Sequence, residues 1–237
     1  MSPEQPSPVI WERPEPDERR AAAPLPRAHL VQAAVRLADA EGLTAVSIRN
    51  VATALGIRPM RLYNHVAGKD DLLALMIDEV YAEVARDLPR ASDPWRERAL
   101  AVARATRRAV LRHPWAIDLL GGRPYLGPNT LEVSEATAAA LSQAPGRGEP
   151  QALRVAVGLL SSYLLGALRR EIGELRASAD SGLDTHQWQV TLGPYLGRQL
   201  ATGRLPMIER IVRAPDPDAT QAFESEIALI LDALGRG

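Results

Sequence analysis

The stretch that most constrains how this chain can fold is residues 43–73, LTAVSIRNVATALGIRPMRLYNHVAGKDDLL. It predicts two short helices joined by a tight turn, followed by a third helix. Ser47 suits the N-cap of the first helix, because its hydroxyl can accept a hydrogen bond from the free N–H groups of the first turn. Gly56 stands where a left-handed residue would end that helix. Pro59 suits the first position of the second helix, where its missing N–H costs nothing.

The second short helix is predicted to present a polar row to solvent. Leu62 and Val66 are spaced to face inward. The side chains left outward are Arg58, Arg61, Asn64 and His65. A helix, a glycine turn and a second helix with such a row form the pattern of a DNA-reading helix-turn-helix.

Composition favours an all-α protein around this motif. The 237 residues are 46% hydrophobic but only 4% aromatic, so the core is expected to consist mostly of Leu, Ala, Val and Ile. The chain has no cysteine, which excludes disulfides, thiolate zinc sites and cysteine nucleophiles. Its formal net charge is -1, yet residues 27–69 hold six Lys or Arg against Asp39 and Glu41. This local excess of about +4 is expected for a segment that contacts phosphate.

The chain divides into three predicted parts. Residues 1–26 contain seven prolines with mixed charge and are expected to form a flexible N-terminal arm. Residues 27–75 form the helix-turn-helix domain, and residues 76–237 form a larger helical domain. Two interpretations stay open for the apolar cluster at residues 9–11: a patch that docks on the folded body, or part of an arm that touches DNA.

Helical spacing predicts the remaining elements. A fourth helix, from residue 69 to about 87, is apolar on several faces, so it must touch two bodies and can transmit movement between them. Residues 151–175 are nearly apolar all round, which is typical of a central or interface helix. The other expected helices are 27–41, 95–112, 115–120, 128–143, 186–213 with a break near Gly203 and Pro206, and 218–234.

A longer pattern runs through the first of these segments. It reads Ser47-x-Arg49-x-Val51-Ala52-x-x-Leu55-Gly56-Ile57, then Leu62-Tyr63-x-His65-Val66-x-x-Lys69-x-x-Leu72. With these residues at this spacing, residues 27–75 resemble the DNA-binding domain of the tetracycline-repressor (TetR) family. The resemblance covers more than a dozen positions, so it is more specific than a bare glycine turn.

The resemblance implies a set of DNA contacts. Ser47 and Arg49 would meet phosphate and base, and Tyr63 and Lys69 would anchor phosphates. The major-groove face would hold Arg58, Pro59, Arg61, Asn64 and His65. Alternatives stay open for two of these residues: Arg49 as a solvated helix arginine, and Tyr63 as a core aromatic with its hydroxyl at the rim.

Arg58 departs from the Ser or Thr often found at its position in the family. It is a poor N-cap, with an expected loss of about 1 kcal/mol relative to a good one. We therefore expect Arg58 to be placed for DNA, where an arginine can bind guanine in a bidentate manner.

The resemblance also implies a homodimer. In the family, the helices that correspond to residues 151–175 and 218–234 pair with their symmetry mates as a four-helix bundle. The alternative is that these apolar stripes only fill the core of their own chain. Two recognition helices related by a twofold axis would read a palindromic operator about one helical turn apart, ~34–36 Å.

The run WRERALAVARATRRAVLRHPWAIDLLGGRP is similar to the start of the ligand domain of the tetracycline-responsive members. Leu119 and Ala85 stand where those members have a metal-binding and a drug-binding histidine, so a magnesium–tetracycline inducer is not expected. The resemblance favours a more apolar ligand. The candidate lining residues are Trp115, Leu119, Arg123, Tyr125, Tyr163, Trp188 and Tyr195. For Arg123 the alternative is a cap on helical carbonyls, and for Trp115 and Trp188 it is a place in the core.

No enzyme pattern is found in the sequence. The four histidines lack a carboxylate at metal-ligand spacing, Ser161-Ser162 has no glycine elbow, and no glycine-rich phosphate loop is present. We expect no catalytic residues, metal or cofactor.

The N-terminus has no secretion signal, and the apolar run at 155–168 is too short to span a bilayer, so a cytoplasmic protein without a membrane partner is expected. The resulting hypothesis is a ligand-responsive repressor. The alternatives are an activator of the same family, and a small-molecule-binding helical protein without DNA function.

Overall fold

The computed structural model describes residues 9–16, 25–215 and 217–236, and within these ranges every regular element is a helix, which confirms the all-α prediction. The α-helices are α1 (Arg27–Glu41), α2 (Ile48–Ala54), α3 (Pro59–Tyr63), α4 (Lys69–Arg86), α5 (Trp95–Arg112), α6 (Pro128–Leu141), α7 (Pro150–Ser181), α8 (Thr185–Leu200), α9 (Pro206–Val212) and α10 (Ala219–Gly235). Three short 3-10 helices are η1 (Ile10–Glu12), η2 (Leu43–Ala45) and η3 (Pro114–Asp118).

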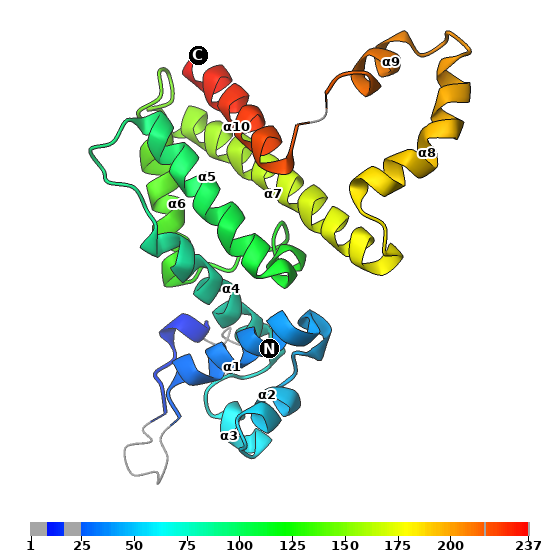
Figure 1. Ribbon diagram of the computed structural model, residues 1–237. Coiled ribbons are helices and arrows are strands. Elements are labelled where there is room, and N and C mark those ends of the chain that lie inside the picture. Colours follow the sequence, from blue (N-terminus) through cyan, green and yellow to red (C-terminus); the bar gives the residue numbers. More distant parts are fainter. Residues whose placement is uncertain (1–8, 17–24, 216, 237) are drawn as a thin grey trace, which may run out of the picture.

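Helices α1, α2 and α3 form a small head at one end of the molecule (Figure 1). The predicted signals act where expected: the Ser47 hydroxyl accepts from the Asn50 N–H at 3.1 Å, and Pro59 is the first residue of α3. Gly56 has φ +66°, a backbone conformation that residues with a Cβ rarely adopt. Val51 and Leu62 are fully buried in one core cluster, in which α2 packs against both α1 and α3.

Helix α4 leaves the head and runs into the larger helical body (Figure 1). It packs against α1 on one side and against α5 and α6 on the other. Nine of its residues are buried, which is why its sequence is apolar on more than one face. The expectation that this helix touches two bodies is confirmed.

The larger body is built from α4, α5, α6, α7 and α10. Helix α7 is longer than the predicted 151–175 and ends at Ser181, where the next residue, Gly182, has a φ of +71°. The apolar stripe of α10 is buried within its own chain, where Phe223, Ile227 and Leu231 pack with residues of α5 and α7. The intramolecular alternative therefore describes this stripe, and any partner must bind other faces of α7 and α10.

Helices α8 and α9 project away from the body (Figure 1). The predicted segment 186–213 is broken between Leu200 and Pro206, where Gly203 has φ +70°. Neither helix has a buried residue.

Part of the predicted flexible arm is folded onto the body. Ile10 in η1 is buried in the core, and Arg13 forms an ion pair with Asp71 at the start of α4, at 2.5 Å. For residues 9–11 the docking interpretation is therefore correct, because an apolar cluster beside the α1–α4 junction gains burial there. The parts of the arm at 1–8 and 17–24 lie outside the described residues.

Helix α7 also bears on the membrane question. It continues beyond the apolar run at 155–168, and by length and composition alone it could cross a bilayer. One such helix is weak evidence for a membrane span, since core helices of water-soluble proteins pass the same test.

Candidate nucleic-acid interface and ligand cavity

The outer surface of the head carries most of the predicted DNA-contacting residues. Ser47 and Arg61 are partly exposed. Six more residues are exposed: Arg49, Arg58, Pro59, Tyr63, Asn64 and Lys69. Tyr63 is half exposed, so the structure does not place it in the core, as the core-aromatic alternative for this residue would require.

His65 is the exception, because its side chain is only 3% exposed. The prediction extended the helical spacing of α3 to residue 65, but α3 ends at Tyr63. The turn that follows is closed by the His65 N–H, which donates to the Leu62 carbonyl at 2.8 Å. This turn leaves the imidazole buried, so the outward placement predicted for His65 is wrong.

The start of α3 is shaped as the sequence suggested. Arg58 holds the N-cap position without a side-chain hydrogen bond to the helix, so its guanidinium is left for other contacts. A shallow hollow of about 520 Å³ is lined by Ile57, Arg58, Met60, Arg61 and Asn64. Met60 is 73% exposed at an outward position of α3, next to Pro59.

A cavity of about 410 Å³ lies in the larger body, between α4, α5, α6 and α7. Its wall contains aliphatic residues and a set of hydroxyls. The lining residues are Tyr81, Val102, Thr106, Leu120, Gly121, Val133, Ser134, Thr137, Val157, Leu160, Ser161, Ser162, Leu164, Leu165 and Leu168. The sequence prediction missed this set, although hydroxyls at 130, 134 and 137 recur at helical spacing.

None of the predicted ligand-lining residues borders this cavity. Trp115 is buried in the core, as its alternative interpretation held, and Tyr163 packs on Phe223. Trp188 and Tyr195 lie exposed on α8, which turns away from the body. The positions of these aromatic residues depend on how helices far apart in the sequence pack together. The spacing of residues within one helix does not predict that packing.

The other three predicted lining residues meet in a neighbouring cleft of about 620 Å³. Leu119, Arg123 and Tyr125 share it with Asp118 and Arg169, among others. Within the described residues Arg123 makes no hydrogen bond to a helical carbonyl, whereas Arg169 donates to the Leu120 carbonyl at 2.9 Å. Capping of this loop is therefore the role of Arg169, and the capping alternative for Arg123 is wrong.

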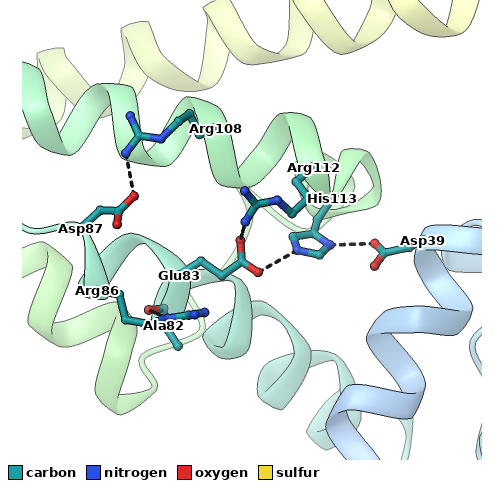
Figure 2. A network of polar contacts seen from close by, with 8 residues as sticks. All are labelled: Asp39, Ala82, Glu83, Arg86, Asp87, Arg108, Arg112 and His113. Carbon is teal, nitrogen blue, oxygen red and sulfur yellow. Dashed lines mark hydrogen bonds and ion pairs between the residues drawn. The ribbon is translucent and has the colours of Figure 1, made fainter.

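A polar network joins the head to the body, as Figure 2 shows. His113, which follows α5, lies with Nδ1 2.7 Å from Asp39 Oδ1 on α1 and with Nε2 3.3 Å from Glu83 Oε1 on α4. Glu83 also accepts a hydrogen bond from Arg112. The Trp115 indole N–H donates to the same Asp39 oxygen at 2.7 Å. One carboxylate of the head thus has two partners from the segment that follows α5.

Both parts of the chain match models of known protein families. Residues 30–76 match the model described as bacterial regulatory proteins, tetR family. Residues 88–236 match the model described as tetracyclin repressor-like, C-terminal domain.

Similar proteins include repressors that match over most of their length. The HTH-type transcriptional repressor DrrR1 of Streptomyces coeruleorubidus is 33% identical over 230 residues, which cover 95% of this chain and 83% of that one. The class A tetracycline repressor from Escherichia coli is 28% identical over 87% of this chain and 89% of its own. The crystal structure of Streptomyces coelicolor ActR with actinorhodin has a TM-score of 0.75 and 28% identity, covering 90% of this chain and 96% of that one.

Proposed function

Because the chain belongs to the tetracycline-repressor family, we propose that it represses transcription by binding a palindromic operator as a homodimer, and that a small, largely apolar ligand releases it. The observation that carries this proposal is the position of α4. Its first turn adjoins the head, and Tyr81 further along the same helix lines the cavity. Ligand binding and operator binding would therefore both act on the position of α4.

The proposed DNA-binding residues are those that the head leaves accessible. They are Ser47, Arg49, Arg58, Pro59, Arg61, Tyr63, Asn64 and Lys69. Arg58 and Arg61 at the hollow of α3 are suited to read guanine, and exposed Met60 is suited to a thymine methyl. Lys69 and Tyr63 would bind phosphates, which makes affinity fall with salt. We also propose that the head ends near residue 75, inside α4.

Exposed apolar residues support a dimer through the outer faces of α7 and α10. Val155 and Leu159 on α7 lie one helical turn apart and are both about half exposed. Leu229 on α10, at 67% exposed, lies on the side opposite the buried stripe of that helix. These side chains gain burial when two copies pair, and the pairing brings two recognition helices to one operator.

Release follows if the ligand binds one arrangement of α4 better than the other. A shift of α4 changes the spacing of the two recognition helices, and operator affinity falls by the coupling free energy, typically ~1–3 kcal/mol. The network at Asp39, Glu83 and His113 provides a second connection between the cavity's helices and α1. ActR was crystallised with actinorhodin, a precedent that supports a small-molecule ligand for a chain of this fold. We place the protein in the cytoplasm, where the operator is, and assign it no catalytic activity.

The test is a mobility-shift assay with DNA from upstream of the protein's own gene. We expect sequence-specific, salt-sensitive binding, weakened tenfold or more in Arg58→Ala. Arg204→Ala is the matched control, because Arg204 is also exposed but lies in the loop between α8 and α9. No specific binding at low salt would contradict the proposal and favour a ligand-binding protein without DNA function.

A further inference from the structure

The cavity between α4, α5, α6 and α7 has no charged wall. Every described residue that lines it is aliphatic, a glycine, a serine or threonine, or Tyr81. A carboxylate or ammonium group placed there would lose its hydration without gaining a partner of opposite charge. The part of a ligand that enters this cavity must therefore be uncharged.

The hydroxyls on two walls have already used their hydrogen. Thr106 Oγ1 on α5 donates to the Val102 carbonyl at 2.9 Å. Thr137 Oγ1 on α6 donates to the Val133 carbonyl at 2.8 Å. A hydroxyl has one hydrogen and two lone pairs, so each of these oxygens is left as an acceptor. Ser134 at the rim follows the same pattern, donating to the Thr130 carbonyl at 2.7 Å.

The wall formed by α4 has the opposite character. Tyr81 lines the cavity, and within the described part of the chain its hydroxyl makes no hydrogen bond. Burial raises the pKa of the Tyr81 phenol, so the group stays protonated and keeps its hydrogen to donate. The cavity thus offers a donor on α4 and acceptors on α5 and α6.

We propose that the ligand of this cavity is an uncharged molecule with an apolar body that donates hydrogen bonds to Thr106 and Thr137 and accepts one from Tyr81. Such a molecule bridges α4 to α5 and α6. The identification of this ligand as the effector rests on the proposed function, whereas the match between ligand and wall does not.

The experiment uses rigid three-ring probes that differ in one group. 2-(Hydroxymethyl)anthraquinone has a neutral donor and carbonyl acceptors, 2-methylanthraquinone lacks the donor, and 2-(hydroxymethyl)anthracene lacks the carbonyls. Anthraquinone-2-carboxylate is charged at neutral pH. Binding is measured by equilibrium dialysis on the full chain without DNA. We expect 2-(hydroxymethyl)anthraquinone to bind at least fivefold more tightly than each of the other three.

Isosteric variants assign the preference to the wall. Thr106→Val and Thr137→Val should reduce the advantage of the hydroxymethyl over the methyl compound to less than twofold. Tyr81→Phe should likewise reduce the advantage of 2-(hydroxymethyl)anthraquinone over 2-(hydroxymethyl)anthracene to less than twofold. Thr53→Val is the matched control, because Thr53 makes the same bond to a carbonyl, that of Arg49 at 3.0 Å, but lies on α2. Thermal unfolding of each variant checks that it is folded.

Three outcomes overturn the proposal: equal binding of the carboxylate, equal binding of the methyl compound, or no binding of any probe. The last counts against it because a cavity of this volume lies within the size range of small-molecule sites. The predicted order of affinities in a protein that binds no operator would leave the proposal standing and contradict the proposed function instead. Operator binding without the predicted order of affinities would contradict the ligand proposal and leave the proposed function standing.

Discussion

Asp39 and His113 connect the head to the larger body, with Asp39 Oδ1 on α1 lying 2.7 Å from His113 Nδ1 at the end of α5. The same oxygen accepts the Trp115 indole N–H at 2.7 Å. His113 and Trp115 are both buried, so both donors depend on this carboxylate for satisfaction. The contact is therefore a structural link between two parts that bind different partners.

Replacing Asp39 by alanine should weaken this link. The substitution leaves buried N–H groups without their acceptor, so the free energy of unfolding should fall by about 1–3 kcal/mol. Urea denaturation followed by circular dichroism measures the change. Glu41→Ala on the same helix is the control, because Glu41 is exposed and has no ion pair among the described residues. Equal stability of the two variants would show that the contact contributes nothing.

Asp78 of α4 caps the N-terminus of α6, and its loss should cost more. Its carboxylate is buried and accepts hydrogen bonds from the backbone N–H groups of Asn129 and Thr130 and from both side chains. Asp78→Ala leaves these donors unsatisfied, and we expect a loss of about 3 kcal/mol in the free energy of unfolding. The neighbouring Glu79→Ala should change stability by less than about 0.5 kcal/mol. A small effect in Asp78→Ala would contradict the role of this cap.

Adjacent residues after α3 should separate stability from DNA binding. His65 is buried and Asn64 is exposed. His65→Ala should lower the free energy of unfolding by about 2 kcal/mol, because it empties a packed site. Asn64→Ala should leave stability within about 0.5 kcal/mol of the parent and change operator affinity. Thermal unfolding and the mobility-shift assay test the pair, and the opposite pattern would restore the original prediction for His65.

The ion pair between Arg104 and Glu224 predicts a pH dependence. Its hydrogen bonds, 2.6 and 2.5 Å long, lower the pKa of the Glu224 carboxyl from 4.5, and Arg104 causes most of that shift. A lowered folded-state pKa gives stability that is present above pH 4.5 and is lost as the pH falls through the folded value. Arg104→Met should therefore be less stable than the parent at pH 7, with the difference shrinking below pH 4.5. The contribution is small because both side chains are partly exposed.

Urea denaturation at pH 7, 4.5 and 3 measures this difference. Arg36→Met is its control, since Arg36 is exposed on α1 without an ion pair among the described residues. A difference between Arg104→Met and the parent that stays constant across these pH values would contradict the assignment.

A charged residue on the proposed dimer face should dissociate the dimer. Leu159→Glu and Leu229→Glu each place a carboxylate where two copies would bury an apolar side chain. Sedimentation velocity should show a lower mass than for the parent protein. Leu131→Glu on α6 is a matched control, because Leu131 is similarly exposed but lies outside that face. Unchanged sedimentation of both α7 and α10 variants would place the interface elsewhere.

Local chemistry made the helices predictable. The segment 95–112 was predicted with the same bounds as α5, because Pro94 and Pro114 limit it on both sides. Ser47, Gly56 and Pro59 acted as expected because a cap, a turn and a first helical residue are decided within a few positions. The same local reasoning failed at His65, where the helix ended one turn earlier than the pattern suggested.

The cavity was not predictable in this way. Its wall combines Tyr81, Thr106, Thr137 and Ser161 from four helices, and each of these residues looks ordinary in its own segment. The aromatic residues that the sequence favoured are placed by long-range packing instead, as Trp115 is by its bond to Asp39. Which helix faces meet depends on the whole core, and no spacing rule within one helix contains that information.

The folded part of the N-terminal segment limits how this protein can be recombined with its relatives. Ile10 fills the core beside α4, Arg13 pairs with Asp71, and Trp11 lies where a Cβ on Gly127, just before α6, would come within 2.7 Å of it. A chimeric biosensor that joins only the helix-turn-helix domain to the ligand-binding domain of another protein would separate these residues from the residues they pack against. Fusions should therefore carry residues 9–16 together with α1, α4 and the start of α6 from the same parent.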